Sequence, residues 1–116
     1  MKPFLYLAGP YSRDPGFYVK LAEAWYTQLI QEGFYVFCPH LSHYPNEIRP
    51  LPYKTWMEQD IAWLEKCDVL FRFSTDKSPG ADQEVLHAIA KQIPHFTSHA
   101  LLMEWREAWD GRKKQS

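Results

Sequence analysis

Residues 78–84 carry the groups best suited to chemistry in this chain. They read Ser-Pro-Gly-Ala-Asp-Gln-Glu, follow an apolar run and open a segment with helical spacing of apolar residues. A glycine turn at the start of a helix leaves backbone N–H groups unpaired, and the helix dipole favours an anion there. Glu84, close behind that turn, is a candidate nucleophile. The segment therefore predicts a site for a sugar phosphate or a nucleotide.

The elements that must position this segment alternate along the chain. Continuous apolar runs predict strands at residues 4–8, 34–38, 68–73 and 93–96. Helical spacing predicts helices at residues 17–32, 55–66, 80–91 and about 98–110. This order favours an α/β fold, a three-layer doubly wound (Rossmann- or flavodoxin-like) domain with a four- or five-stranded, mainly parallel sheet. We expect residues 1–116 to form this single domain.

Ligands of such folds bind beyond the carboxyl ends of the strands, near the point where the strand order reverses. The segments expected at that edge are 9–14, 39–53 and 75–84. Residues 39–53 contain four prolines and no periodicity, which predicts one long loop of the kind that often acts as a lid. Thr55 is expected to cap the following helix, with Glu58 completing a capping box.

Composition and charge exclude several classes of partner. The net charge is −1 and the basic residues are scattered, which argues against a surface for duplex nucleic acid. Cys38 and Cys67 fit neither a disulfide framework nor a zinc pattern, so we expect reduced packing cysteines. Apolar runs fall short of a membrane helix, and the N-terminus lacks the apolar region of a signal peptide. We expect a cytoplasmic protein without a membrane partner.

Metal and cofactor sites find little support. His40 and His43 could touch a phosphate or a base, but no third ligand has suitable spacing. Glu84 and His87 form one Glu-x-x-His unit, whereas carboxylate-bridged di-iron sites need two. No glycine-rich dinucleotide motif or phosphate loop occurs. We therefore expect neither a metal nor a cofactor.

Three short motifs stand in order along the first 95 residues. They are Tyr6-Leu7-Ala8-Gly9-Pro10-Tyr11, Asp60-x-x-Trp63-Leu64-x-x-Cys67-Asp68 and Ser78-x-Gly80-x-x-x-Glu84-x-x-x-Ala88. Together they resemble the nucleoside 2-deoxyribosyltransferase superfamily. The branches that look most similar are the nucleoside 5′-monophosphate N-glycosidases and a set of uncharacterised bacterial and phage proteins.

The resemblance implies a role for each matching residue. Glu84 would attack the anomeric carbon and form a glycosyl ester, Asp60 would transfer a proton near the base, and Tyr6 would contact the nucleophile. Ser78 stands where the transferases have an aspartate for the 5′-hydroxyl and the hydrolases a serine for the phosphate, which implies a phosphorylated substrate. The residues expected to bind substrate are Gly9, Pro10, Tyr11, Arg13, His43, Ser78, Pro79 and Gly80.

The implied activity is hydrolysis of the N-glycosidic bond of a nucleoside 5′-monophosphate. A nucleotide-binding sensor or phage accessory module without chemistry is one alternative, and transfer of the sugar between bases is another. Asp82 departs from the small residue of the hydrolases, so it either points away from the phosphate or indicates a different ligand. The family usually forms oligomers, which implies a homodimer or higher homo-oligomer. Trp105 and Trp109 on the last helix are expected in the core or in such an interface.

Overall fold

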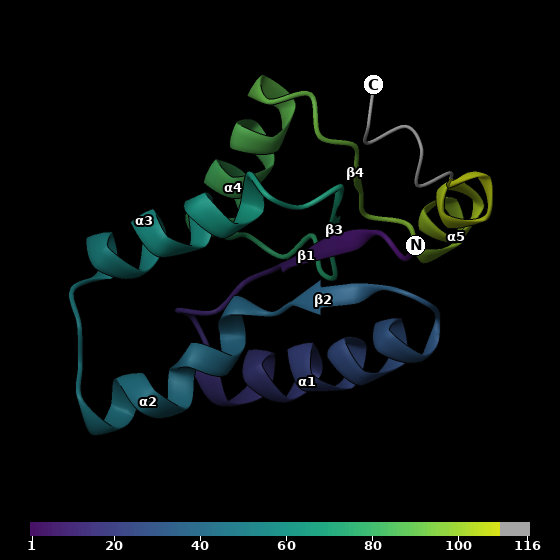
Figure 1. The fold of residues 1–116 in the computed structure, drawn as a ribbon. Helices are drawn as coiled ribbons and strands as arrows, with labels where there is room; N and C mark the ends of the chain where they lie inside the picture. The colour runs from purple at the N-terminus through teal and green to yellow at the C-terminus, as the bar shows by residue number, and fades with distance from the viewer. Residues whose placement is uncertain (110–116) are drawn as a thin grey trace.

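The computed structural model describes residues 1–109, in which a parallel β-sheet lies between two layers of helices (Figure 1). The strands are β1 (Phe4–Ala8), β2 (Tyr35–Phe37), β3 (Val69–Arg72) and β4 (His95–Phe96). The α-helices are α1 (Pro15–Gln31), α2 (His43–Ile48), α3 (Tyr53–Leu64), α4 (Pro79–Ala90) and α5 (His99–Ala108), and η1 (Pro39–Ser42) is a 3-10 helix. The last residue of the predicted terminal helix, residue 110, lies outside the described range.

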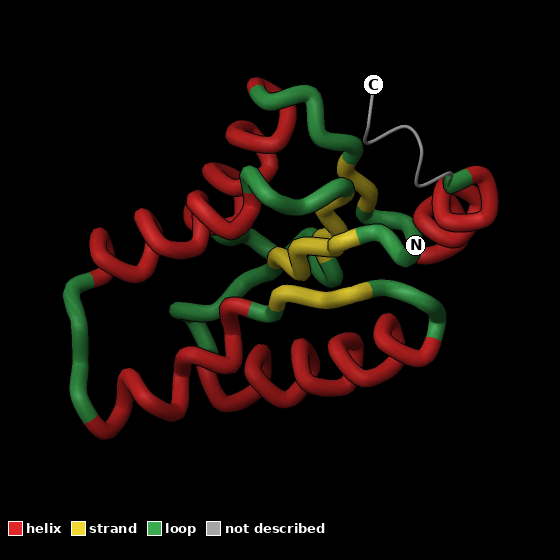
Figure 2. The backbone as a smooth tube through the Cα atoms, viewed as in Figure 1, coloured by secondary structure: helices red, strands yellow, loops and turns green. Residues whose placement is uncertain are grey.

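Within the described residues the sheet has four strands in the order β2-β1-β3-β4, all parallel. Tyr6 of β1 pairs with Phe37 on one side and with Leu70 on the other. The chain moves outward from β1 to β2 and then returns to the other side of β1, so the strand order reverses between β1 and β3. Figure 2 shows the strands at the centre and the helices around them. The predicted α/β, Rossmann-like fold is confirmed.

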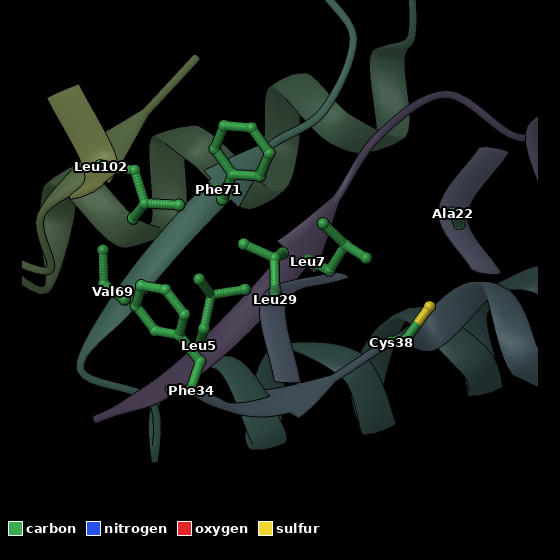
Figure 3. Close-up of a cluster of buried hydrophobic side chains, with 9 residues drawn as sticks. All are labelled: Leu5, Leu7, Ala22, Leu29, Phe34, Cys38, Val69, Phe71 and Leu102. Atoms are coloured by element: carbon green, nitrogen blue, oxygen red, sulfur yellow. The ribbon is translucent and has the colours of Figure 1, made fainter. Parts of the chain in front are cut away.

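The layers follow from the alternation of side chains along β1. Leu5 and Leu7 point to one face, where they pack with Leu29 of α1 and Leu102 of α5 (Figure 3). Tyr6 and Ala8 point to the other face and pack with side chains from α3 and α4. Full burial of a leucine side chain contributes roughly 1.5–3 kcal/mol, so both faces of the central strand stabilise the domain.

Local capping sets the start of several helices. Asp14 Oδ1 accepts a hydrogen bond from the Phe17 N–H at 3.3 Å, and Pro15 occupies the first turn, so α1 begins two residues before its predicted start. Ser78 Oγ caps α4 in the same way by accepting from the Ala81 N–H at 3.1 Å. Gly33 has φ +101°, which suits a residue that ends a helix.

The prediction of one long loop over residues 39–53 is wrong. Most of this segment forms η1 and α2, and α3 already begins at Tyr53. Pro39 is the first residue of η1, and Pro45 lies in the first turn of α2, where a helix does not need the missing N–H. In the sequence, prolines at the start of a helix therefore cannot be distinguished from prolines within a loop.

The predicted capping box at Thr55 is also wrong. Pro52 is the N-terminal cap of α3, without a side-chain hydrogen bond. The Thr55 N–H instead donates to the Pro52 carbonyl at 3.0 Å, so Thr55 lies within the first helical turn. Thr55 therefore cannot cap the helix, because the helix already begins before it.

Both cysteines, Trp105 of α5 and Trp109, which caps the end of that helix, contact their own domain. Cys38 and Cys67 are buried and form no disulfide, as predicted. Trp105 packs beside Phe96 and the core, and Trp109 Nε1 donates to the Met1 carbonyl at 2.9 Å. Homo-oligomer formation stays a prediction. In residues 1–109 no helix combines the length and apolar character needed to cross a membrane.

Candidate functional site

The main cavity of the domain lies beyond the carboxyl ends of β1 and β3, where the reversal of strand order predicts a ligand site. Its volume is about 690 Å³, within the range of small-molecule sites. The β1–α1 loop, the η1–α2 segment, the first two turns of α3 and the N-terminus of α4 line it. The predicted site residues that line it are Gly9, Tyr11, Arg13, His43, Asp60, Ser78, Pro79, Gly80 and Glu84.

Glu84 and Asp60 form the floor of this cavity, and Tyr6 lies beneath Glu84. Glu84 is only 6% exposed, and Tyr6 lies beneath it, fully buried, with its O–H donating to Glu84 Oε2. Tyr6 is not among the lining residues. It therefore orients the Glu84 carboxyl from below rather than facing the cavity.

Burial controls the protonation of the two carboxyls. It raises the pKa of Glu84 to about 8, with a further increase from the nearby Asp60, against the opposing effects of the Tyr6 hydrogen bond and the Arg72 charge. Burial also raises the pKa of Asp60 to about 6. Both carboxyls therefore favour the protonated form more than a free carboxyl does, and Glu84 does so more strongly than Asp60.

The N-terminus of α4 offers fewer free donors than the sequence suggests. Pro79 has no N–H, the Ala81 N–H is capped by Ser78 Oγ, and the Asp82 N–H donates to the Ser78 carbonyl. Within residues 1–109 the Gly80 N–H is the free donor of this turn. The Ser78 hydroxyl proton is not used by the cap, so it remains available to a ligand.

Asp82 points away from the cavity, which is the first of the two alternatives given for it above. Its Oδ1 accepts from Arg72 Nη1 at 2.6 Å, and it does not line the main cavity. The buried Arg72 also donates to the carbonyls of Ser74, at 2.8 Å, and Asp76, at 2.9 Å. This arginine, which the sequence analysis did not identify, ties the end of β3 to the loop that leads to Ser78.

The β1–α1 loop is held against η1 and α2. The Pro10 carbonyl accepts from His40 Nε2 at 2.7 Å, and Tyr11 Oη contacts His43 Nδ1 at 2.7 Å. Because a carbonyl only accepts, His40 carries its proton on Nε2, and burial lowers its pKa. Pro10 thus shapes the loop without lining the cavity, whereas Tyr11 and His43 line it.

Gly9 leaves room for an aromatic ring. A Cβ at this position would overlap the Phe73 side chain, while a Cβ at Gly16 would meet nothing within 4 Å. We expect Gly9→Ala to lower the free energy of unfolding by about 1–3 kcal/mol, because Phe73 must leave its packed position. Urea denaturation checks this, with Gly16→Ala as the matched control and Gly9→Ala/Phe73→Leu as the relief variant. Equal stability of the two single variants would contradict the close approach.

The fold and the site define a Rossmann-like α/β domain with a buried carboxylate cavity at its switch point. The chain belongs to a family described as a domain of unknown function (DUF7768), which matches residues 3–98. The matched range includes every cavity residue named above. No curated protein matches the chain. The resemblance to the nucleoside 2-deoxyribosyltransferase superfamily therefore stays a prediction.

Proposed function

We propose that this protein hydrolyses the N-glycosidic bond of a nucleoside or deoxynucleoside 5′-monophosphate, releasing the free base and a sugar 5-phosphate. The observation that carries the proposal is the placement of Glu84. This buried carboxyl lies on the cavity floor, six residues after a serine hydroxyl and four after a free N–H at a helix N-terminus. A nucleophile beside an anion site suits a phosphorylated glycoside.

The chemistry follows the double displacement of a retaining glycosidase. A Glu84 carboxylate oxygen bonds to C1′ while the C1′–N bond breaks, its electron pair goes to the base, and Asp60 supplies a proton to the base. Water, deprotonated by Asp60, then attacks C1′ of the ester and frees Glu84. The raised pKa values of both carboxyls favour a proton on the pair, and positive charge developing at C1′ favours the form in which Glu84 is ionised and Asp60 carries that proton.

The 5′-phosphate would bind at the N-terminus of α4. The Ser78 hydroxyl and the Gly80 N–H would donate to its oxygens, supported by the helix dipole. Arg13 and Lys77 also line the cavity and carry positive charge. Since Asp82 is turned toward Arg72, no carboxylate of this first turn opposes the phosphate.

One observation favours a second candidate, a nucleotide sensor that performs no chemistry. Burial raises the pKa of Glu84 to about 8, which favours the protonated form of this carboxyl at neutral pH. A protonated carboxyl is a poor nucleophile, and it can instead donate a hydrogen bond to a bound ligand. The sensor would use the same cavity.

Release of free base from nucleoside 5′-monophosphates and from the matching nucleosides, measured by chromatography, tests the proposal. We expect release from the monophosphates, with kcat/KM lowered roughly 10- to 100-fold for the nucleosides, because each lost charge-assisted hydrogen bond costs about 1.5–3 kcal/mol. Tight nucleotide binding without release at high protein concentration would favour the sensor. Formation of a new nucleoside after addition of a second base would instead indicate transfer.

A further inference from the structure

Asn46 is fixed in one orientation on the wall of the cavity. Its Oδ1 accepts from the Leu51 N–H at 2.9 Å and from the Trp56 Nε1–H at 2.7 Å. Both partners are donors, so the atom between them must be the carbonyl oxygen of the amide, and its two lone pairs are used. The side chain thereby connects α2 to the segment before α3, through Leu51, and to α3 itself, through Trp56; Figure 1 shows these helices at the same end of the molecule.

This arrangement leaves the amide nitrogen of Asn46 as a donor. Among residues 1–109, Nδ2 has no hydrogen-bond acceptor, and Asn46 lines the cavity. Other polar groups of the same wall are already used: Ser42 Oγ donates to the Pro39 carbonyl, and both ring nitrogens of His43 have partners. Asn46 therefore presents N–H groups on a wall where Ser42 and His43 are already engaged, and the Tyr53 hydroxyl also lines the cavity there.

The surroundings of Asn46 suit a planar aromatic ligand. Leu51, Tyr53, Trp56 and Met57 line the cavity around the start of α3. Aromatic and apolar side chains bind the faces of nucleobases by stacking, which does not discriminate between bases. Discrimination at this wall must then come from a directional polar group, and Asn46 Nδ2 supplies one.

We propose that Asn46 selects bases with a carbonyl oxygen at purine C6 or pyrimidine C4 (guanine, hypoxanthine, uracil and thymine) over adenine and cytosine, which carry an amino group at that position. The inference rests on the proposed nucleotide function of the cavity. An asparagine with a free oxygen reads adenine by accepting from its amino group and donating to its ring nitrogen. With Oδ1 occupied, Asn46 can only donate, so it needs an acceptor on the base, and at purine C6 or pyrimidine C4 that acceptor is a carbonyl oxygen. An exocyclic amino group in that place would bring two hydrogen-bond donors together. Both would lose their hydrogen bonds to water and gain none in return.

Asn46→Asp tests this selection with little change of shape. One carboxylate oxygen keeps both internal hydrogen bonds, while the other replaces the N–H groups by an acceptor. Dissociation constants would be measured by calorimetry for the monophosphates of guanine, thymine, adenine and cytosine. Both proteins would carry Glu84→Gln to prevent turnover. We expect at least a tenfold preference for guanine and thymine, and its loss or reversal in Asn46→Asp.

Controls separate base selection from charge and folding. The added negative charge weakens the binding of all nucleotides together. The readout is therefore the ratio of the affinities for the keto bases (guanine and thymine) and the amino bases (adenine and cytosine). Gln83→Glu adds the same charge to the cavity from α4 and should leave that ratio unchanged. Unaltered tryptophan fluorescence and thermal unfolding of Asn46→Asp would show that the contact with Trp56 is kept.

Equal affinities for keto and amino bases, or an unchanged ratio in Asn46→Asp, would overturn the inference while nucleotide binding leaves the proposed function standing. Failure of every nucleotide to bind, in the wild type as well, would overturn both. The two failures are therefore distinguishable in one set of titrations.

Discussion

Glu84→Gln is expected to abolish base release from nucleoside 5′-monophosphates, with a loss on the order of 10⁴-fold in kcat. The amide nitrogen and oxygen of glutamine cannot form a stable ester at C1′, so the double displacement has no first step. The shape of the site is kept, because the Tyr6 O–H can donate to the amide oxygen as it does to the carboxyl. Nucleotide binding should consequently persist.

Two measurements on the same preparation check this expectation. Chromatography follows the free base, and calorimetry follows nucleotide binding. Glu58→Gln makes the same chemical change on an exposed position of α3 and should retain full activity. Turnover by Glu84→Gln within tenfold of the wild type would remove Glu84 from the role of nucleophile, whatever the substrate.

The order and type of most elements could be predicted because each has a local cause. Leu5 and Leu7 lie in a continuous apolar run, which indicates a strand buried on both faces. Asp14 and Ser78 supply helix caps within three residues of the N–H groups that they accept from. The floor residues Glu84 and Asp60 then line one cavity because their helices start at one edge of a parallel sheet.

The parts that could not be predicted depend on contacts between distant elements. Arg72 and Asp82 are ten residues apart, and only the packing of α4 on β3 turns the carboxylate away from the cavity. Asn46 acquires its donor character from Leu51 and Trp56, which no spacing rule connects to it. Segment 39–53 was predicted as a loop because the position of a proline within a helix is not visible before the helix is known.

Glu84→Gln should also stabilise the domain, by about 3 kcal/mol at pH 7. The pKa of Glu84 is about 8 in the folded protein and near its ordinary value of 4.5 in the unfolded chain. As pH rises above 4.5 the unfolded state loses the proton first, so the wild type loses stability until pH passes about 8. Each pKa unit corresponds to about 1.4 kcal/mol. Glutamine does not titrate, so the variant does not lose this free energy of unfolding as pH rises.

Urea denaturation of both proteins between pH 4.5 and 8 measures the effect. The two free energies of unfolding should nearly coincide at pH 4.5 and separate steadily as pH rises. Glu58→Gln, on an exposed position, should differ from the wild type by less than about 0.5 kcal/mol throughout. A gap between Glu84→Gln and wild type that stays constant with pH would show that the folded carboxyl titrates near its ordinary pKa. Because no ligand is present, this result tests the electrostatics of the cavity independently of its substrate.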